Sequence, residues 1–175
     1  MNFDLQRLNG DKRAAMVAHF LALPLKDRSL RFGTALATTL IAAYVDDINF
    51  GRDGVFGVRN DRLMLVGVAH VAIEGDMAEL ALSVLPTHRG RGMATELAER
   101  GIAYARDRRV PRLLMHCRSA NTPIMRIAQR FGMDIYASGG DADAYLDLES
   151  IAPIASPVLA GRDAYRVALR SESLP

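Results

Sequence analysis

The chain has 175 residues, a length typical of one domain that buries a sizeable hydrophobic core. Hydrophobic residues make up 50% of it, charged residues 24%, and the net charge is +2, so no strong field attracts nucleic acid or a membrane surface. Cys117 is the only cysteine, which excludes an internal disulfide and fits a reducing compartment.

The sequence predicts a cytoplasmic protein that does not bind a membrane. The first residues lack the basic stretch and apolar core of a signal peptide. The longest apolar run, residues 35–45, is too short to cross a bilayer.

The first part of the chain predicts helices followed by a strand hairpin. Pro24 ends the first helical pattern, Gly33 interrupts the second, and Asn60-Asp61 forms a turn between two runs rich in apolar and β-branched residues. The expected elements are helices at 11–23 and about 27–45, then strands at 54–60 and 62–73.

The second part alternates strands with helices. Leu80, Leu82 and Val84 alternate with polar or small residues, which is the period of a strand. Residues 112–117 form a nearly continuous apolar run, as in a central strand. The expected elements are strands at 78–86 and 112–117, a helix after Gly92, a helix within 121–133, and a hairpin at 134–148 around Gly139-Gly140.

This order predicts one α/β domain over residues 1–150. We expect an α+β mixed sheet that is mostly antiparallel, with helices on both faces and one parallel crossover from 78–86 to 112–117. Residues 151–175 contain three prolines and are expected to form a tail with at most one helix. That tail is interpreted as a docking or dimerising arm, or as a loose segment.

Residues 85–101, LPTHRGRGMATELAERG, join a strand to a helix through two glycines flanked by arginines. No side chain directly before Met93 can accept a hydrogen bond as a helix cap does, so backbone N–H groups are left over. Glycine lets a ligand approach the backbone, and arginine adds charge. The pattern favours a phosphate site, with a tight turn and solvated arginines as the alternative. It lacks the lysine of a P-loop and the third glycine of a dinucleotide fingerprint.

The pattern Arg89-x-x-Gly92-x-Ala94 resembles the Arg/Gln-x-x-Gly-x-Gly/Ala pyrophosphate loop of the GNAT superfamily, the acyl-CoA-dependent N-acyltransferases. The segment AELALSVLPTHRGRGMATEL is similar to the family's fourth strand and third helix. RLLMHCRSANTPIMRIAQRFGM is similar to its fifth strand and following helix. The resemblance covers about residues 54–148 well and the first helices only in layout.

The resemblance implies acetyl-CoA as the donor and an amine as the acceptor. Amides at the loop would hold the CoA pyrophosphate together with Arg89, main-chain groups of the preceding strand would pair with the pantetheine arm, and Asn121 would border the thiol. A backbone amide near Val84 or Leu85 would polarise the thioester carbonyl. The implied cofactor-binding residues are Leu82, Val84, Arg89, Arg91, Gly92, Met93, Ala94 and Asn121.

Glu79 is the predicted catalytic base, because the family often uses a carboxylate on this strand, commonly through water. The alternative is an ordinary surface glutamate. Many family members place a tyrosine, the general acid, seven residues after the asparagine, where this chain has Ala128. The general acid is therefore not identified. A module that senses acyl-CoA without chemistry is the alternative to an N-acetyltransferase.

Other reactive residues predict no additional site. His116 and Cys117 are adjacent in a strand and point to opposite faces, so they do not share one site. Cys117 is expected to be buried, and His116 to be a structural histidine, with a position facing the acceptor cleft as the alternative. No spacing of His, Cys or acidic residues predicts a metal site. The basic run 106–112 lies at a helix end, where cations are common, so nucleic-acid binding is not expected. The acceptor is not identified, and a homodimer is compatible with the sequence.

Overall fold

Seven strands form one sheet in the part of the chain that the computed structural model describes, residues 4–149. Their order across the sheet is β1-β2-β3-β4-β5-β7-β6. The expected tail, 151–175, lies outside the described residues. The elements are β1 (Leu5–Arg7), η1 (Gly10–Lys12), α1 (Arg13–Ala22), α2 (Leu25–Phe32), α3 (Thr38–Asp46), β2 (Gly54–Arg59), β3 (Leu65–Glu74), β4 (Met77–Val84), η2 (Pro86–His88), α4 (Met93–Asp107), β5 (Arg112–Arg118), α5 (Thr122–Arg130), β6 (Asp134–Ser138) and β7 (Asp141–Asp147).

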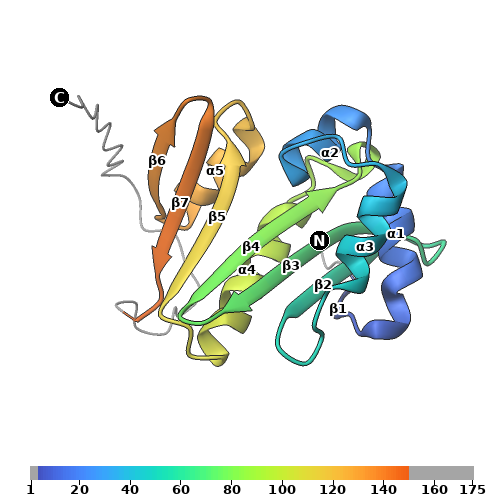
Figure 1. Cartoon of the computed structure of the whole chain (residues 1–175), viewed down its shortest axis with the longest axis horizontal. Coiled ribbons are helices and arrows are strands. Elements are labelled where there is room, and N and C mark those ends of the chain that lie inside the picture. The colour runs from blue at the N-terminus through green and yellow to red at the C-terminus, as the bar shows by residue number, and fades with distance from the viewer. Residues whose placement is uncertain (1–3, 150–175) are drawn as a thin grey trace.

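One pair of neighbouring strands is parallel, and it opens the sheet. β4 and β5 pair in parallel only from Met77–Glu79 to Arg112–Leu114, whereas the other neighbours are antiparallel. Beyond Glu79 the two strands diverge, as Figure 1 shows. The predicted crossover, mixed sheet and closing hairpin are therefore confirmed.

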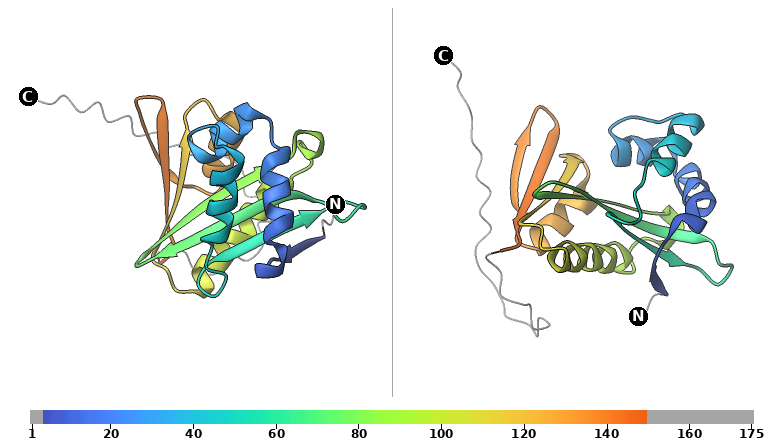
Figure 2. Two further views of the ribbon diagram at one scale, coloured as in Figure 1. Left: turned by 45° about the vertical axis from the view of Figure 1, so that its right-hand side comes forward. Right: turned by 60° about the horizontal axis from the view of Figure 1, so that its bottom comes forward.

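Helices cover both faces of the sheet, as predicted (Figure 2). α4 and α5 pack on one face, where they share a core with β2 to β7. α1 and α3 pack on the other face against β2 and β3. On that second face, β5, β7 and β6 carry exposed side chains such as His116, Arg118 and Tyr136.

Close packing of α4 on the sheet depends on a small residue in the helix. A Cβ atom at Gly101 would lie 2.8 Å from Leu80 Cδ1 and 3.1 Å from Val71 Cγ2. Gly101 therefore lets the helix backbone approach β3 and β4 directly, which fixes where α4 begins relative to the end of β4.

The structure differs from the sequence-based prediction in three places. β1 was not predicted. β3, predicted to start at residue 62, starts at Leu65. Residues 60–64 form a turn instead, in which the Asn60 side chain accepts hydrogen bonds from the amides of Arg62 and Met64 and Leu63 has a φ of 60°. The region 27–45 is two helices, since Gly33 has a φ of 76° and ends α2.

Candidate functional site

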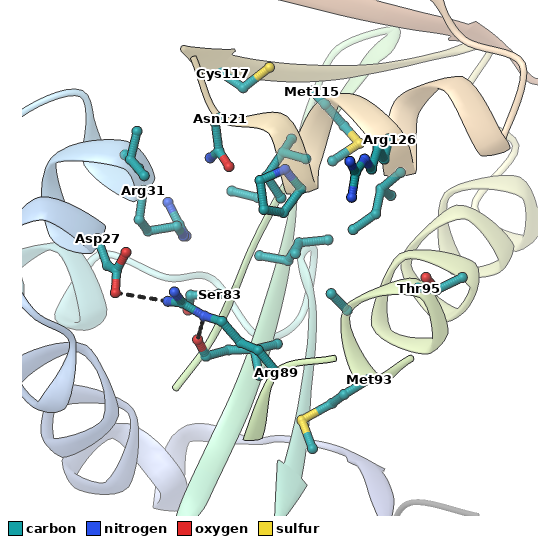
Figure 3. A pocket seen from close by; sticks show the side chains of 18 of the residues that line it. Asp27, Arg31, Ser83, Arg89, Met93, Thr95, Met115, Cys117, Asn121 and Arg126 are labelled. Carbon is teal, nitrogen blue, oxygen red and sulfur yellow. Dashed lines mark hydrogen bonds and ion pairs between the residues drawn. The ribbon is translucent and has the colours of Figure 1, made fainter. Parts of the chain in front are cut away.

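A cleft of about 1130 Å³ opens where β4 and β5 separate. Its walls come from these two strands, from α2, from the first turn of α4 with the loop before it, and from the length of α5 (Figure 3). Small-molecule sites span about 300–1,000 Å³, so the cleft is large enough for an extended ligand.

The first turn of α4 presents unpaired amides to this cleft. Gly92 is the N-cap, with a φ of 83° and no side-chain cap, and Gly90 has a φ of 74°. Both glycines take backbone angles that other residues rarely adopt. The backbone N–H groups of residues 90–95 have no acceptor within residues 4–149. Because the helix dipole is positive at this end, the turn is suited to bind an anion at the cleft wall.

The two loop arginines differ in position. Arg89 donates from Nε to the Val84 carbonyl at 2.9 Å and forms an ion pair with Asp27 of α2 at 2.8 Å. The Arg89 side chain thus ties the loop to α2 at the cleft (Figure 3). Arg91 is exposed, and its side chain is not part of the cleft wall.

The far end of β4 has a backbone edge that β5 does not cover. The Leu85 amide donates to Val66 of β3 at 2.8 Å, so in the alternating antiparallel ladder Leu82 and Val84 direct their backbone groups away from β3. These groups face the gap left by β5, because pairing with β5 stops at Glu79. Of the two amides expected to polarise a ligand carbonyl, Val84 or Leu85, the Leu85 amide is already paired with Val66, whereas the Val84 amide points into the gap.

The α5 side of the cleft carries Asn121 but no acid at the family's tyrosine position. Asn121 precedes α5, makes no capping bond with its side chain, and borders the cleft. Ala128 is completely buried in the core. Cys117 is buried as predicted, with Sγ 3.7 Å from Met125 Sδ, and burial raises the pKa of its thiol.

The opposite face of the sheet, on the side of α1 to α3, carries the titratable groups nearest the gap. Glu79 is exposed, stands at the last residue of β4 paired with β5, and is not part of the cleft wall. His116 borders the cleft, and its Nδ1 lies 2.6 Å from Asp143 Oδ1 of β7. This pairing was missed from the sequence, where His116 was interpreted as structural.

A buried serine–histidine pair supports the cleft wall. Ser83 borders the cleft, and its Oγ lies 2.9 Å from His19 Nε2. His19 Nδ1 donates to the Leu65 carbonyl at 3.0 Å, so Nε2 accepts from the serine. Burial lowers the pKa of His19 to about 4, and it is therefore neutral near pH 7.

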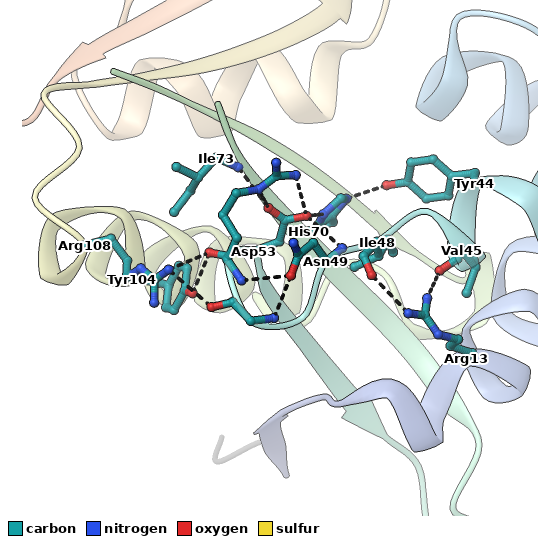
Figure 4. A network of polar contacts seen from close by, with 12 residues as sticks. Arg13, Tyr44, Val45, Ile48, Asn49, Asp53, His70, Ile73, Tyr104 and Arg108 are labelled. Carbon is teal, nitrogen blue, oxygen red and sulfur yellow. Dashed lines mark hydrogen bonds and ion pairs between the residues drawn. The ribbon is translucent and has the colours of Figure 1, made fainter. Parts of the chain in front are cut away.

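A second polar network joins α3, β3 and the loop before β2 (Figure 4). Arg31, which borders the cleft, donates to Tyr44 Oη at 2.7 Å, and Tyr44 Oη lies 2.7 Å from His70 Nδ1. His70 Nε2 lies 3.4 Å from Asp53. Burial, and then the charge of Arg31, lower the pKa of His70. Burial alone would raise the pKa of Asp53, but hydrogen bonds led by that from Arg52 lower it.

No metal-binding cluster of three or more His, Cys, Asp or Glu side chains occurs within residues 4–149. Over the same residues, no helix combines the length and the apolar character that crossing a membrane requires.

Several solved structures of acetyltransferases share this fold. The GNAT domain of PAT from S. lividans superimposes with a TM-score of 0.71 at 18% identity, over 82% of this chain and 89% of that one. An N-acetyltransferase from Staphylococcus aureus Mu50 gives 0.66 at 16% identity, over 85% and 99%. yncA from Salmonella typhimurium, solved with its cofactor acetyl-CoA, gives 0.65 at 17% identity, over 90% and 100%. These identities establish the fold alone.

Sequence comparison establishes the family. A search of curated proteins gave no match. The sequence profile of the Acetyltransferase (GNAT) family matches residues 35–133, which include α3, β2 to β5, α4 with its preceding loop, and α5. The chain belongs to the GNAT acetyltransferase family and is an acyltransferase of the acyl-CoA-dependent type.

Proposed function

We propose that the protein transfers an acetyl group from acetyl-CoA to a primary amine of a small molecule or protein, by direct attack while both substrates are bound. The observation that carries this proposal is the row of unpaired amides at the start of α4, which opens on the cleft between β4 and β5. Family membership and the acetyl-CoA of the similar yncA structure support it.

Donor binding uses backbone groups on two sides of the cleft. The amides of Arg91, Gly92, Met93 and Ala94 hold the pyrophosphate, because the helix dipole and unpaired N–H groups favour an anion there. The Leu82 and Val84 backbone holds the pantetheine arm as an added strand would, and Asn121 borders the thiol. Arg89 contributes charge and exchanges its ion pair with Asp27 for one with the phosphates.

The chemistry needs a neutral amine, a polarised carbonyl and an exit for the thiolate. Acetyl-CoA supplies the activated acyl group. The Val84 amide polarises its carbonyl, since this N–H points into the gap between the strands. Glu79 is the base that the sequence predicts, and in that role it would receive the amine proton through water. Its support is its place where the strands part, on the face opposite α4 and α5.

An acyl-CoA sensor without chemistry is the second candidate. It is favoured by one observation: the position where the family places its tyrosine is Ala128, completely buried in the core. The sensor binds acetyl-CoA tightly and releases no thiol with any amine, so one assay separates the two candidates.

The test is acetyl-CoA-dependent thiol release with pools of primary amines, followed by mass spectrometry of the acetylated amine. Gly92→Glu places a carboxylate beside the α4 amides and abolishes release. Gly75→Glu is the matched control, because Gly75 also has a positive φ and open space around it but lies in the β3–β4 turn. Absence of acetyl-CoA binding at millimolar concentration refutes both candidates.

A further inference from the structure

His116 and Asp143 form a pair on the β5–β7 part of the sheet face that α1 and α3 cover farther along, over β2 and β3. The register of β5 and β7 places the two residues directly opposite each other, although they are 27 residues apart in the chain. His116 lies two residues beyond Leu114, where pairing with β4 ends, so it stands on the β5 side of the opening. It borders the cleft there.

The geometry fixes which ring nitrogen is available. A carboxylate accepts hydrogen bonds, so the 2.6 Å contact with Asp143 Oδ1 places the hydrogen of the neutral ring on Nδ1. Nε2 then carries the lone pair, and it has no partner among the described residues. His116 and Asp143 side chains are 52% and 41% exposed, so solvent reaches the pair. A histidine oriented in this way by a carboxylate is suited to accept a proton.

Other titratable and charged groups lie around His116, on the same sheet face and across the cleft. Arg118 and Asp141 pair with each other at 3.4 Å one rung along the same face, and Tyr145 of β7 lies one rung in the other direction. Across the cleft, α2 contributes Lys26 and Arg31.

Glu79 is less well placed than His116. The Glu79 side chain makes no hydrogen bond or ion pair with any residue between 4 and 149, and it does not border the cleft. A base must lie within hydrogen-bond reach of the amine. A side chain that another residue already holds in place does not have to lose conformational freedom in each turnover. Asp143 holds the ring of His116 in place in this way, whereas no residue among 4–149 holds Glu79.

We infer that His116 is the base for the acceptor amine and that Asp143 is its positioning residue; this inference rests on the proposed function. As the C–N bond forms at the acetyl carbonyl, His116 Nε2 takes one proton from the amine nitrogen. The C–S bond breaks, and the sulfur leaves with the bonding pair as a thiolate, which takes a proton from solvent. The half-exposed ring of His116 then returns its proton to solvent.

The test compares the pH profiles of kcat/KM for one amine in wild type, His116→Gln, Asp143→Asn and Asp141→Asn. We expect His116→Gln to lower kcat/KM by about 10²–10⁴-fold and to remove an acidic limb between about pH 5 and 8, where histidines change charge. Asp143→Asn moves the limb to lower pH, because it removes the charge that favours the imidazolium. Asp141→Asn, the matched control in the neighbouring pair, leaves the limb in place.

Three results overturn the inference, and they separate it from the proposed function. If the acidic limb of the pH profile persists in His116→Gln, or if only Glu79→Gln removes it, His116 is not the base, whereas acetyl transfer itself stands. Equal shifts in Asp143→Asn and Asp141→Asn refute the positioning role. Wild-type protein that binds acetyl-CoA but acetylates no amine refutes the proposed function and the base together. Unchanged acetyl-CoA affinity confirms that each variant is folded.

Discussion

Acidification is expected to destabilise the fold through His19. This residue joins α1 to two strands, because Nδ1 donates to the Leu65 carbonyl and Nε2 accepts from Ser83. Protonation converts Nε2 into a donor, so the serine hydroxyl has to accept instead of donate, and it places a charge in a buried site. The ring is only 2% exposed, and burial lowers the pKa of His19 from 6.5 to about 4.

The sign and the size of the loss of stability follow from the difference between the two pKa values of His19. Between pH 6.5 and 4 the unfolded chain binds the His19 proton more tightly than the folded chain, so the free energy of unfolding falls as the pH falls. The stabilisation is fully present above pH 6.5. The loss is about 2 kcal/mol by pH 5 and about 3 kcal/mol by pH 4, at about 1.4 kcal/mol per pKa unit.

Urea unfolding at pH 7.5 and pH 5.0, for wild type and His19→Gln, measures this effect. At pH 7.5 the variant is less stable by about 1–3 kcal/mol, because buried hydrogen bonds are lost. Between the two pH values, wild type loses about 2 kcal/mol more than the variant. The lowered pKa of His70 acts in the same direction in both proteins and cancels. Equal losses in the two proteins would refute the role of His19.

Three further substitutions test the packing and the charges around the cleft. Gly101→Ala adds a methyl group 2.8 Å from a buried leucine of β4 and lowers the free energy of unfolding by about 1–3 kcal/mol in urea; an unchanged midpoint contradicts this packing. Arg31→Met raises the pKa of His70, measured by NMR titration, because it removes a nearby positive charge. An unchanged pKa of His70 would contradict the contribution of Arg31. Asp27→Asn frees Arg89 for phosphate and lowers the Kd for acetyl-CoA by up to about 5-fold, since exposed ion pairs contribute about 0–1 kcal/mol; a higher Kd contradicts it.

Local patterns predicted most of the fold. The alternation of Leu80, Leu82 and Val84 identified β4, and the Gly139-Gly140 turn identified the final hairpin. Both patterns depend on neighbours in the chain. β1 was missed because its three residues form an edge strand whose pairing with β2 depends on contacts about 50 residues away.

The candidate site was predictable only where its chemistry lies in the backbone of one segment. The positive φ values of Gly90 and Gly92, and the missing cap, follow from residue types in the loop. The pair His116–Asp143 depends instead on the register of β5 and β7, which a single sequence does not reveal. The paired Leu85 amide was likewise hidden, because its partner lies on β3.

The most direct test of the donor site removes one amide from α4. Ala94→Pro deletes an N–H that has no acceptor within residues 4–149, and proline is tolerated in the first turn of a helix. In calorimetric titrations, we expect the variant to bind acetyl-CoA at least about 10-fold more weakly than wild type, which is the loss for one hydrogen bond to a charged group. Pantetheine has no pyrophosphate, so we expect both proteins to bind it equally well. Equal acetyl-CoA affinities in a folded variant would contradict it.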